Sequence, residues 1–455
     1  MSKQVYIKTY GCQMNQNDTE RMLGLLATKG YQKGDSAFLA DLIILNTCAV
    51  REKAEDKLFS LLGEMKEIKK LKPEAILAVS GCVAQYMGER IRLRAPHVDL
   101  VFGTENIHEL PRLVEAVEKQ RTPVVALLPF SDELPPEMPV LRQGKHSAWV
   151  TAIYGCDDRC TYCIVPKVRG DQKSREIPDL VREIEQVVAE GFGEIVLLGQ
   201  NINGYGKDLT PKRSLADLIE ATASVAGVKR VRWLTGHPRD LDEELVRRIA
   251  ALPNVCDYFH IPIQHGDDDI LRQMARGYNR SKYVTKVEMI RSILPDAGIS
   301  TDLIVGFPGE TEEQFQQTVS IVREMRFAAV NTAAYSPRPG TYAATRQDQI
   351  PEDVKDRRLR ELNAVVNEVA ATVSRAMVGS LQEVFVEGPS SKDPNVLTGR
   401  SRNNRVVLFP GPAALTGQLT HVRIHEARPW TVRGEIELSA DQKQEFAHPA
   451  LISHP

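Results

Sequence analysis

The hydrophobic pattern in the first quarter of the chain alternates short apolar runs with amphipathic stretches. In chain order it predicts strand 5–10, a helix beginning at 17–20, strand 42–46, helix 51–69, strand 75–80 and a helix near 85–94. Strands that alternate with helices pair as a parallel sheet. The loops after the carboxyl ends of such strands share one edge of the sheet. We therefore expect residues 1–120 to form a parallel α/β domain.

A second alternating region occupies 142–378, after a proline-rich, irregular segment at 121–141 that is typical of a linker. Its strands are predicted at 148–154, 194–198, 231–234, 258–263, 300–305 and 328–335. Six strands with helical crossovers favour a partial parallel β/α barrel, although an open sheet would give the same pattern. A charged helix at 354–375 ends this region.

After Gly379 the pattern changes to short strands and turns, predicted at 382–386, 397–400, 405–409, 417–424 and 430–437. Residues 379–441 have the size of a small OB-like barrel, and 442–455 form a tail. The predicted fold class is thus two α/β domains followed by a small all-β domain.

Composition narrows the class of protein. Hydrophobic residues make up 42% and charged residues 26% of 455 positions, which is typical of globular domains. The sequence contains no apolar run of eighteen residues and no signal-peptide pattern, so we expect a cytoplasmic protein whose seven cysteines stay reduced. The net charge of −2 gives no global sign of nucleic-acid binding, which must rest on a local patch.

Cys156, Cys160 and Cys163 form a C-x3-C-x2-C run, the tight triad, directly after a predicted strand. Three thiolates on one loop hold three corners of a four-iron cluster and leave one iron open to another ligand. Structural zinc is the main alternative, but it takes four ligands, usually in two pairs. No further Cys or His lies close in the sequence.

Cys12, Cys48 and Cys82, the dispersed triad, each follow an apolar strand and precede a helix. The shared edge of a parallel sheet would bring them together. A helix N-terminus favours the thiolate that cluster ligation requires. Three buried structural cysteines are the alternative. We favour a second cluster, because the same corner recurs in three successive strand–helix units.

The tight triad, with Tyr162 between its last two cysteines, resembles that of the radical S-adenosylmethionine superfamily. There the open iron binds the methionine end of the cofactor, and electron transfer yields a 5′-deoxyadenosyl radical. The resemblance implies that Tyr162 also contacts the cofactor. Later segments match in order: Leu197–Asn201 with Gly199, Gln200 and Asn201 at the amino group, Thr235–Pro238 at the ribose, and Asp302–Thr311 with Gly306 at the adenine.

Over essentially its whole length the chain resembles the methylthiotransferase family, which has a cluster domain, a radical domain and a TRAM domain. The matching segments are Tyr10–Asn15, Asn46–Cys48, Ser80–Cys82, Tyr154–Pro166 and Tyr335–Thr341. In this family the dispersed triad holds an auxiliary 4Fe-4S cluster that carries the sulfur to be inserted. Residues 46–57 resemble the branch that acts on isopentenyladenosine 37 of tRNA.

The resemblance implies a radical enzyme that adds a methylthio group to carbon 2 of that adenosine. One S-adenosylmethionine would methylate the cluster-bound sulfur, and a second would give the radical that removes the carbon-2 hydrogen. The implied partners are the tRNA and a flavodoxin- or ferredoxin-like electron donor, with no membrane, and we expect a monomer. Two alternatives stay open. One is a sister enzyme acting on threonylcarbamoyladenosine 37 or a ribosomal-protein aspartate, and the other is a non-catalytic two-cluster electron carrier with an RNA-binding tail.

A short arginine-rich segment in the last domain is the candidate RNA contact. Arg400, Arg402 and Arg405 are predicted to bind phosphate through bidentate hydrogen bonds, with an ordinary solvated charge run as the alternative.

Some residues depart from the family pattern or carry no motif. Lys167 stands where the family usually has Tyr, and Gly236, His265 and Asp267 stand where it has Ser. We predict no role for these four. Arg276 and Arg280 are each equally compatible with binding the cofactor carboxylate and with a surface ion pair.

Overall fold

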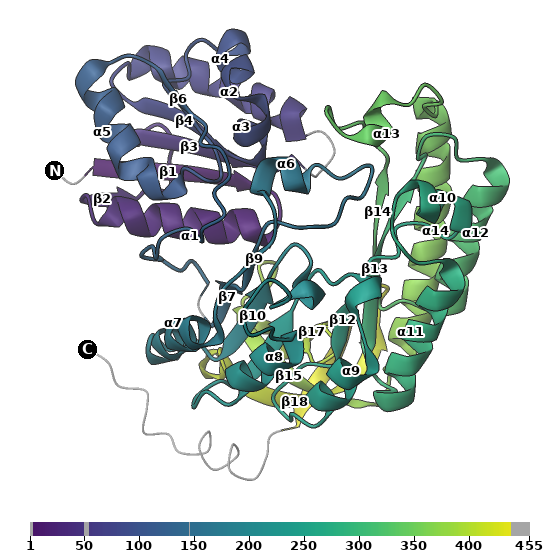
Figure 1. Ribbon diagram of the computed structural model, residues 1–455. Helices are drawn as coiled ribbons and strands as arrows, with labels where there is room; N and C mark the ends of the chain where they lie inside the picture. The colour runs from purple at the N-terminus through teal and green to yellow at the C-terminus, as the bar shows by residue number, and fades with distance from the viewer. Residues whose placement is uncertain (1–2, 50–53, 145, 438–455) are drawn as a thin grey trace, which may run out of the picture.

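The computed structural model describes residues 3–49, 54–144 and 146–437. They form three domains in series (Figure 1). No helix in this part of the chain combines the length and the apolarity that crossing a membrane would require. Three stretches that figure in the sequence predictions lie outside the described residues. They are residues 50–53 of the segment 46–57, residues 438–441 of the all-β domain, and the tail at 442–455.

The N-terminal domain is a six-stranded parallel sheet with strand order β2-β1-β3-β4-β5-β6. Its strands are β1 Lys3–Tyr10, β2 Tyr31–Lys33, β3 Leu42–Thr47, β4 Ile76–Gly81, β5 Leu100–Phe102 and β6 Val124–Ala126. Its helices are α1 Gln13–Ala27, α2 Ala54–Leu71, α3 Cys82–Met87, α4 Glu89–Arg94 and α5 Leu110–Gln120. Helices α1 and α5 cover one face, and α2, α3 and α4 cover the other. The central strands β3 and β4 are buried throughout, because both faces are covered.

Several sequence predictions for this domain were inexact. Helix α1 begins directly after Cys12 instead of at 17–20, and the helix near 85–94 is two short helices separated at Gly88. Strands β2, β5 and β6 were missed because each has only three residues. Strand β6 lies in the segment predicted as a linker and completes the sheet beside β5.

The second domain, which the resemblance implies to be the radical domain, has six parallel strands in two sheets, β11-β10-β7 and β12-β13-β14. The strands are β7 Ser147–Thr151, β10 Glu194–Leu198, β11 Arg230–Trp233, β12 Tyr258–His260, β13 Gly298–Val305 and β14 Ala329–Ala334. The helices outside them are α7 Ile177–Ala189, α8 Leu215–Ala223, α9 Glu243–Ala250, α10 Asp268–Gln273, α11 Arg280–Ile293, α12 Glu312–Met325 and α14 Glu352–Arg375.

A parallel bridge from Val231 to Val255, just before β12, joins the two sheets into one curved wall. One large apolar core lies between this wall and the helices. No pairing of β7 with β14 closes the wall among the described residues, so the barrel is partial, as the sequence predicted.

The last domain is a closed five-stranded barrel, ordered β15-β16-β17-β19-β18. Its strands are β15 Leu381–Pro389, β16 Val396–Ser401, β17 Val406–Pro410, β18 Leu419–Ala427 and β19 Thr431–Glu437. It packs against the amino ends of the radical-domain strands: Arg230 Nη1 donates to the Arg400 carbonyl at 2.6 Å, and Arg232 Nη2 to that of Ser401 at 2.7 Å. The N-terminal domain contacts the opposite, carboxyl ends (Figure 1).

Candidate metal centres

The dispersed triad lies at the carboxyl edge of the N-terminal sheet. Cys12 caps α1, Cys48 follows β3 and Cys82 begins α3, and the Cys48 thiol hydrogen-bonds with both of the others. Glycine permits this approach. Gly81 has φ +89°, and a Cβ there would lie 2.4 Å from both the Asn46 Oδ1 and the Thr47 carbonyl oxygen. The loop therefore requires glycine.

A buried amide network fixes the strand ends beneath the dispersed triad. Asn46 Nδ2 donates to the Asn15 carbonyl at 2.8 Å and to Thr19 Oγ1 at 2.9 Å. Asn15 Nδ2 donates to Asn46 Oδ1 at 3.2 Å, and its own Oδ1 accepts from Cys12 Sγ at 3.4 Å. Both asparagines are fully buried. The network ties α1 to β3 and so positions Cys12 beside Cys48.

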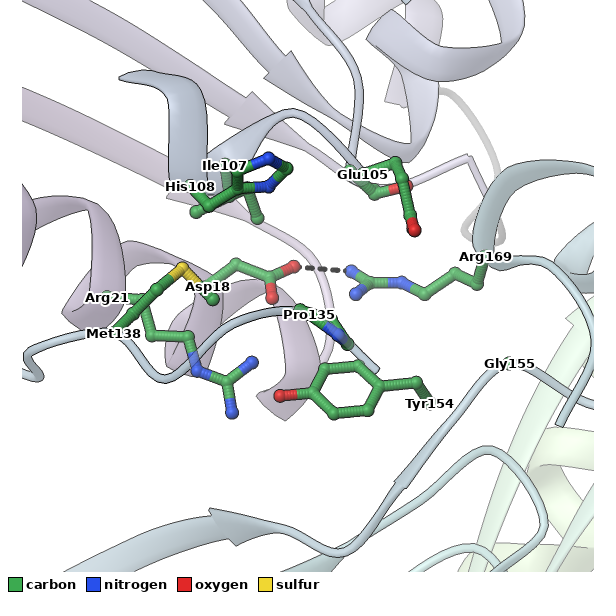
Figure 2. Close-up of a pocket in the computed structure, with 11 residues that line it drawn as sticks. Asp18, Arg21, Glu105, Ile107, His108, Pro135, Met138, Tyr154, Gly155 and Arg169 are labelled. Carbon is green, nitrogen blue, oxygen red and sulfur yellow. Dashed lines mark hydrogen bonds and ion pairs between the residues drawn. The ribbon is translucent and has the colours of Figure 1, made fainter. Parts of the chain in front are cut away.

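The radical domain supplies a cation beside the dispersed triad. Helix α6 (Val165–Arg169) directly follows the tight triad, and Ile164 and Val168 pack in the N-terminal core. Arg169 Nη2 donates to Asp18 Oδ2 at 2.6 Å, and both side chains are buried. Figure 2 shows this pair in the lining of a small cavity, with Arg21 and Tyr154 also in the lining. The cavity has a volume of ≈ 30 Å³, and the Arg21 guanidinium lies 5.2 Å from the centre of the Tyr154 ring.

Two of the three thiols of the dispersed triad have a lowered pKa, which favours the ionised form that ligation requires. The hydrogen bond with Cys48 lowers the pKa of Cys12 to about 5 and that of Cys82 to about 7, and the Arg169 charge lowers both further. Cys48, the shared donor, has its pKa raised by the same hydrogen bonds. The Cys48 thiol and the Arg169 charge thus favour the ionised form of Cys12 and of Cys82, the form that binds metal.

The tight triad lies on one loop beyond β7. There burial is the main influence on two of the thiols, and it raises their pKa values instead of lowering them. It raises the pKa of Cys156 and of Cys163 to about 12. At Cys160, Arg276 Nη1 donates to Sγ at 3.2 Å. The Cys156 and Cys163 thiols therefore ionise only when a metal or another cation compensates for the loss of water.

The spacing of the sulfur atoms tests zinc against a cluster. In the part of the chain that the structure describes, neither triad has all three sulfurs within 4.8 Å of one another. Sulfur ligands of a single tetrahedral zinc ion would lie about 3.8 Å apart, because a Zn–S bond is about 2.3 Å. A four-iron cluster holds its thiolates further apart, one at each corner. The tight triad therefore fits a cluster better than zinc, whereas the dispersed triad, in which Cys48 hydrogen-bonds with Cys12 and Cys82, holds its sulfurs more closely.

A pair of buried amides, Asn201 and Asn203, follows the carboxyl end of β10 and fits the amino group of S-adenosylmethionine. Asn201 Nδ2 donates to Asp240 at 2.7 Å and to Asp158, within the cysteine loop, at 3.0 Å. Asn201 Oδ1 and Asn203 Oδ1 are buried and accept no hydrogen bond from described residues. A buried acceptor without a donor destabilises by roughly 1–3 kcal/mol, which an ammonium ligand would relieve.

The neighbouring carboxylates do not form a further metal site. Asp158, His237 and Asp240 place possible ligand atoms within 4.8 Å of one another. Arg239 and Lys207 already balance the two carboxylates, at 2.7 Å and 2.6 Å. Burial lowers the pKa of His237 to about 3, so it stays neutral. The group instead fixes Asn201 against the cysteine loop.

The other residues predicted to bind the cofactor lie around the same mouth. Tyr162 packs in an apolar cluster with Phe307 and Tyr335. The Gly306 N–H donates to Glu310 Oε2 at 2.5 Å. Gly199 lies close to Ile202 and Ile153, and Gln200 is half-buried beside it. Asp158, Asn203 and Arg169 were not predicted, because their roles depend on contacts between distant segments.

The two triads face one space. Met14, directly after the Cys12–Gln13 corner, packs with Val196 and Leu198 on the inner face of the barrel, and Cys12 lies against the same cluster. Thr151 Oγ1, at the end of β7, donates to Asn17 Oδ1 of α1 at 2.8 Å. The dispersed triad therefore lies over the mouth that the tight triad borders.

Three of the four residues that depart from the family pattern have neighbours that suit them, through hydrogen bonds or through the space that they need. His265 accepts from the Asp267 N–H at 3.0 Å and hydrogen-bonds Glu310 at 2.7 Å, and Asp267 caps α10. A Cβ on Gly236 would lie 2.1 Å from Asn203 Oδ1, so glycine makes room for that amide. Lys167 is exposed, with its Nζ near Gly340.

The structure argues against an RNA role for two of the three predicted arginines. Arg402 binds Asp257 at 2.9 Å, and Arg405 is buried and donates to the Ala328 carbonyl at 3.0 Å. Both hold the last barrel on the radical domain, at the end opposite the triads. Arg400 pairs with Glu387 and is half-exposed. A charge run in the sequence does not reveal which side of a turn becomes an interface.

Comparisons with known families match the chain in three successive parts. Residues 4–103 match the uncharacterized protein family UPF0004, 150–322 the radical SAM superfamily and 375–436 the TRAM domain. These stretches fall on the parallel-sheet domain, the partial barrel and the closed barrel. Among solved structures, the radical S-adenosylmethionine methyltransferase TsrM from Kitasatospora setae has a TM-score of 0.54 at 15% identity, over 76% of this chain and 74% of that one. At this identity the likeness concerns the fold alone.

Two curated relatives carry the name tRNA-2-methylthio-N(6)-dimethylallyladenosine synthase. The protein of Halalkalibacterium halodurans is 44% identical over 95% of this chain and 81% of its own length. That of Burkholderia multivorans is 43% identical over 98% of this chain and 100% of its own length. The family predicted from the cysteine motifs is confirmed, and the chain belongs to the tRNA-2-methylthio-N(6)-dimethylallyladenosine synthase family of radical SAM enzymes.

Proposed function

We propose that this chain adds a methylthio group to carbon 2 of N6-isopentenyladenosine 37 in tRNA, using two molecules of S-adenosylmethionine for each product. The observation that carries the proposal is the meeting of two three-thiol sets at one barrel mouth. When bound, one 4Fe-4S cluster supplies the electron that splits S-adenosylmethionine and the other supplies the sulfur.

The chain's own residues would divide the work at the mouth. Cys156, Cys160 and Cys163 hold the first cluster, and Asn201 and Asn203 offer their carbonyl oxygens to the methionine ammonium group. The dispersed triad holds the second cluster directly above. Met14 and the residues packed on it keep bulk water from the space between the triads, as radical chemistry on a C–H bond requires.

The adenosine has to leave its stacked position to reach this mouth, since the anticodon loop cannot enter intact. The closed barrel lies at the other end of the radical domain, so it would bind a part of the tRNA away from base 37. We further propose a flavodoxin- or ferredoxin-like electron donor, a monomeric enzyme and a cytoplasmic location, where its tRNA substrate is found.

Nucleoside analysis of tRNA from a strain that lacks this gene tests the substrate. We expect 2-methylthio-N6-isopentenyladenosine to disappear and N6-isopentenyladenosine to accumulate, with recovery on re-expression of the chain. An unchanged level of the methylthio nucleoside would contradict the proposal, and loss of a methylthio derivative of threonylcarbamoyladenosine would assign the chain to a sister activity. Absence of 5′-deoxyadenosine from the fully loaded, reduced protein would favour the electron-carrier alternative.

A further inference from the structure

Arg276 holds one fixed position against the tight triad. It follows α10, is 5% exposed, and uses all three guanidinium nitrogens on protein acceptors. Nη1 donates to Cys160 Sγ at 3.2 Å, Nε to the Tyr278 hydroxyl at 2.9 Å and Nη2 to the Pro262 carbonyl at 3.0 Å. A guanidinium held at three points keeps its orientation.

Among the described residues this charge has no carboxylate partner. Across the described ranges no Asp or Glu oxygen lies within 4.0 Å of the Arg276 guanidinium, whereas Arg169, beside the other triad, pairs with Asp18 at 2.6 Å. A buried cation is stable only beside a compensating charge. The group within reach that can carry a negative charge is the Cys160 sulfur. The surface ion pair considered from the sequence is therefore wrong for Arg276.

The tight triad is asymmetric as a result. Cys156 Sγ hydrogen-bonds with the Asp158 carboxylate, at 3.7 Å. Among the contacts of the described residues, Cys160 alone receives a hydrogen bond from an arginine. Hydrogen bonds to the sulfurs and nearby charge are two of the factors that set the reduction potential of an iron–sulfur cluster.

We propose that Arg276 raises the reduction potential of the cluster on the tight triad by donating a hydrogen bond to Cys160 Sγ. Reduction adds one electron and breaks no bond, so the cluster becomes more negative, and the fixed guanidinium stabilises that form more than the oxidised one. This inference rests on the proposed function only in requiring a cluster at this triad. Arg276 thus acts through Cys160 and favours transfer of the first electron to the cluster.

The test is a redox titration of the anaerobic, fully loaded Arg276→Gln variant with dithionite and mediators, followed by electron paramagnetic resonance. The signal that changes on adding S-adenosylmethionine belongs to the tight triad, and the other cluster serves as an internal standard. At a fixed potential we expect the reduced-to-oxidised ratio of the first cluster to fall about tenfold, a midpoint shift of 59 mV for one electron. The second midpoint should not move.

Arg280→Gln is the matched control, because Arg280 lies four residues away and pairs with Glu324 on the surface. It should leave both midpoints unchanged. Arg276→Lys keeps the charge but not the three-point contact, so it should shift the first midpoint in the same direction by less. It takes the place of Arg276→Gln if the latter binds too little iron to titrate.

An unchanged first midpoint in loaded Arg276→Gln, or equal shifts of both clusters, would overturn the inference. So would weaker S-adenosylmethionine binding at an unchanged midpoint, which would return Arg276 to the cofactor carboxylate. If the wild-type chain makes no methylthio nucleoside but the midpoint still shifts, the proposed function fails and this inference stands.

Discussion

The tight triad comes from one loop, 156–163, whereas the dispersed triad is assembled from three strand ends of a parallel sheet. The first has its three cysteines on one segment and is supported by residues of its own domain, such as Arg276 at Cys160. The second exists only when β1, β3 and β4 are paired in register and α6 of the next domain is docked. Damage to packing should therefore reach the dispersed triad before the tight one.

The two triads also differ in the pKa values of their thiols. The dispersed thiols are prepared for ionisation by Cys48 and Arg169, while the tight triad is buried and depends on the metal and on Arg276. The ligands of the dispersed triad come from separate elements, and no single loop holds them at the correct spacing. A lowered thiol pKa favours metal binding at such a site. A local loop tolerates thiols that ionise only on binding metal.

The largest effect on stability is expected from Arg169→Gln, which breaks the link between the two triads. It leaves the Asp18 carboxylate buried without a partner, so the free energy of unfolding should fall by about 3–5 kcal/mol. Chemical denaturation of the purified protein measures this. Arg159→Gln is the control, since its pair with Asp171 is largely exposed, and it should change stability by less than about 1 kcal/mol. Equal effects of the two variants would contradict the comparison.

Gly81→Ala should disturb the dispersed triad and spare the tight one. The new Cβ meets the Asn46 amide and the Thr47 carbonyl at 2.4 Å in a left-handed backbone, so we expect a loss of about 2–3 kcal/mol. Thermal unfolding and separate quantification of the two clusters by electron paramagnetic resonance test this. Gly63→Ala is the control, because nothing lies within 4 Å of its Cβ in α2, and it should stabilise by about 1 kcal/mol. Equal loss of both clusters in Gly81→Ala would show that the triads are not independent.

The smallest effect is expected at the tight-triad mouth, from Asn203→Ala. Removing an unsatisfied buried acceptor should not destabilise the chain, but S-adenosylmethionine should bind about tenfold more weakly, or roughly 1.4 kcal/mol. Calorimetric titration of the loaded protein measures this. Thr222→Val in α8 also removes an unsatisfied buried oxygen, remote from the mouth, and should not change the affinity. Unchanged affinity in Asn203→Ala would remove this residue from the cofactor site.

Much of this arrangement could be predicted from the sequence, because it depends on periodicity. Alternating strands and helices predict that Cys12, Cys48 and Cys82 lie at one edge of a sheet, and the six-strand pattern favours a partial barrel. Both follow from a general property of parallel sheets. Strands of three residues, such as β6, fall below what such a pattern resolves.

Contacts between domains could not be predicted in the same way. Arg169 and Arg276 lie in different segments from the groups they serve, and Arg402 and Arg405 looked like an RNA patch although they face another domain. A basic side chain has the same appearance in a sequence whether it meets a phosphate, a thiolate or a carbonyl group. Only the way in which the three domains pack together shows which of these partners each basic side chain contacts.

The central claim, that the two triads have separate tasks, is tested most directly in the Cys48→Ala variant. 5′-Deoxyadenosine and the methylthio nucleoside are measured in the same reaction, with iron content showing that the tight triad remains loaded. We predict that 5′-deoxyadenosine forms and that the methylthio nucleoside is absent. Formation of the methylthio nucleoside, or loss of 5′-deoxyadenosine while the tight triad keeps its iron, would contradict the division of tasks.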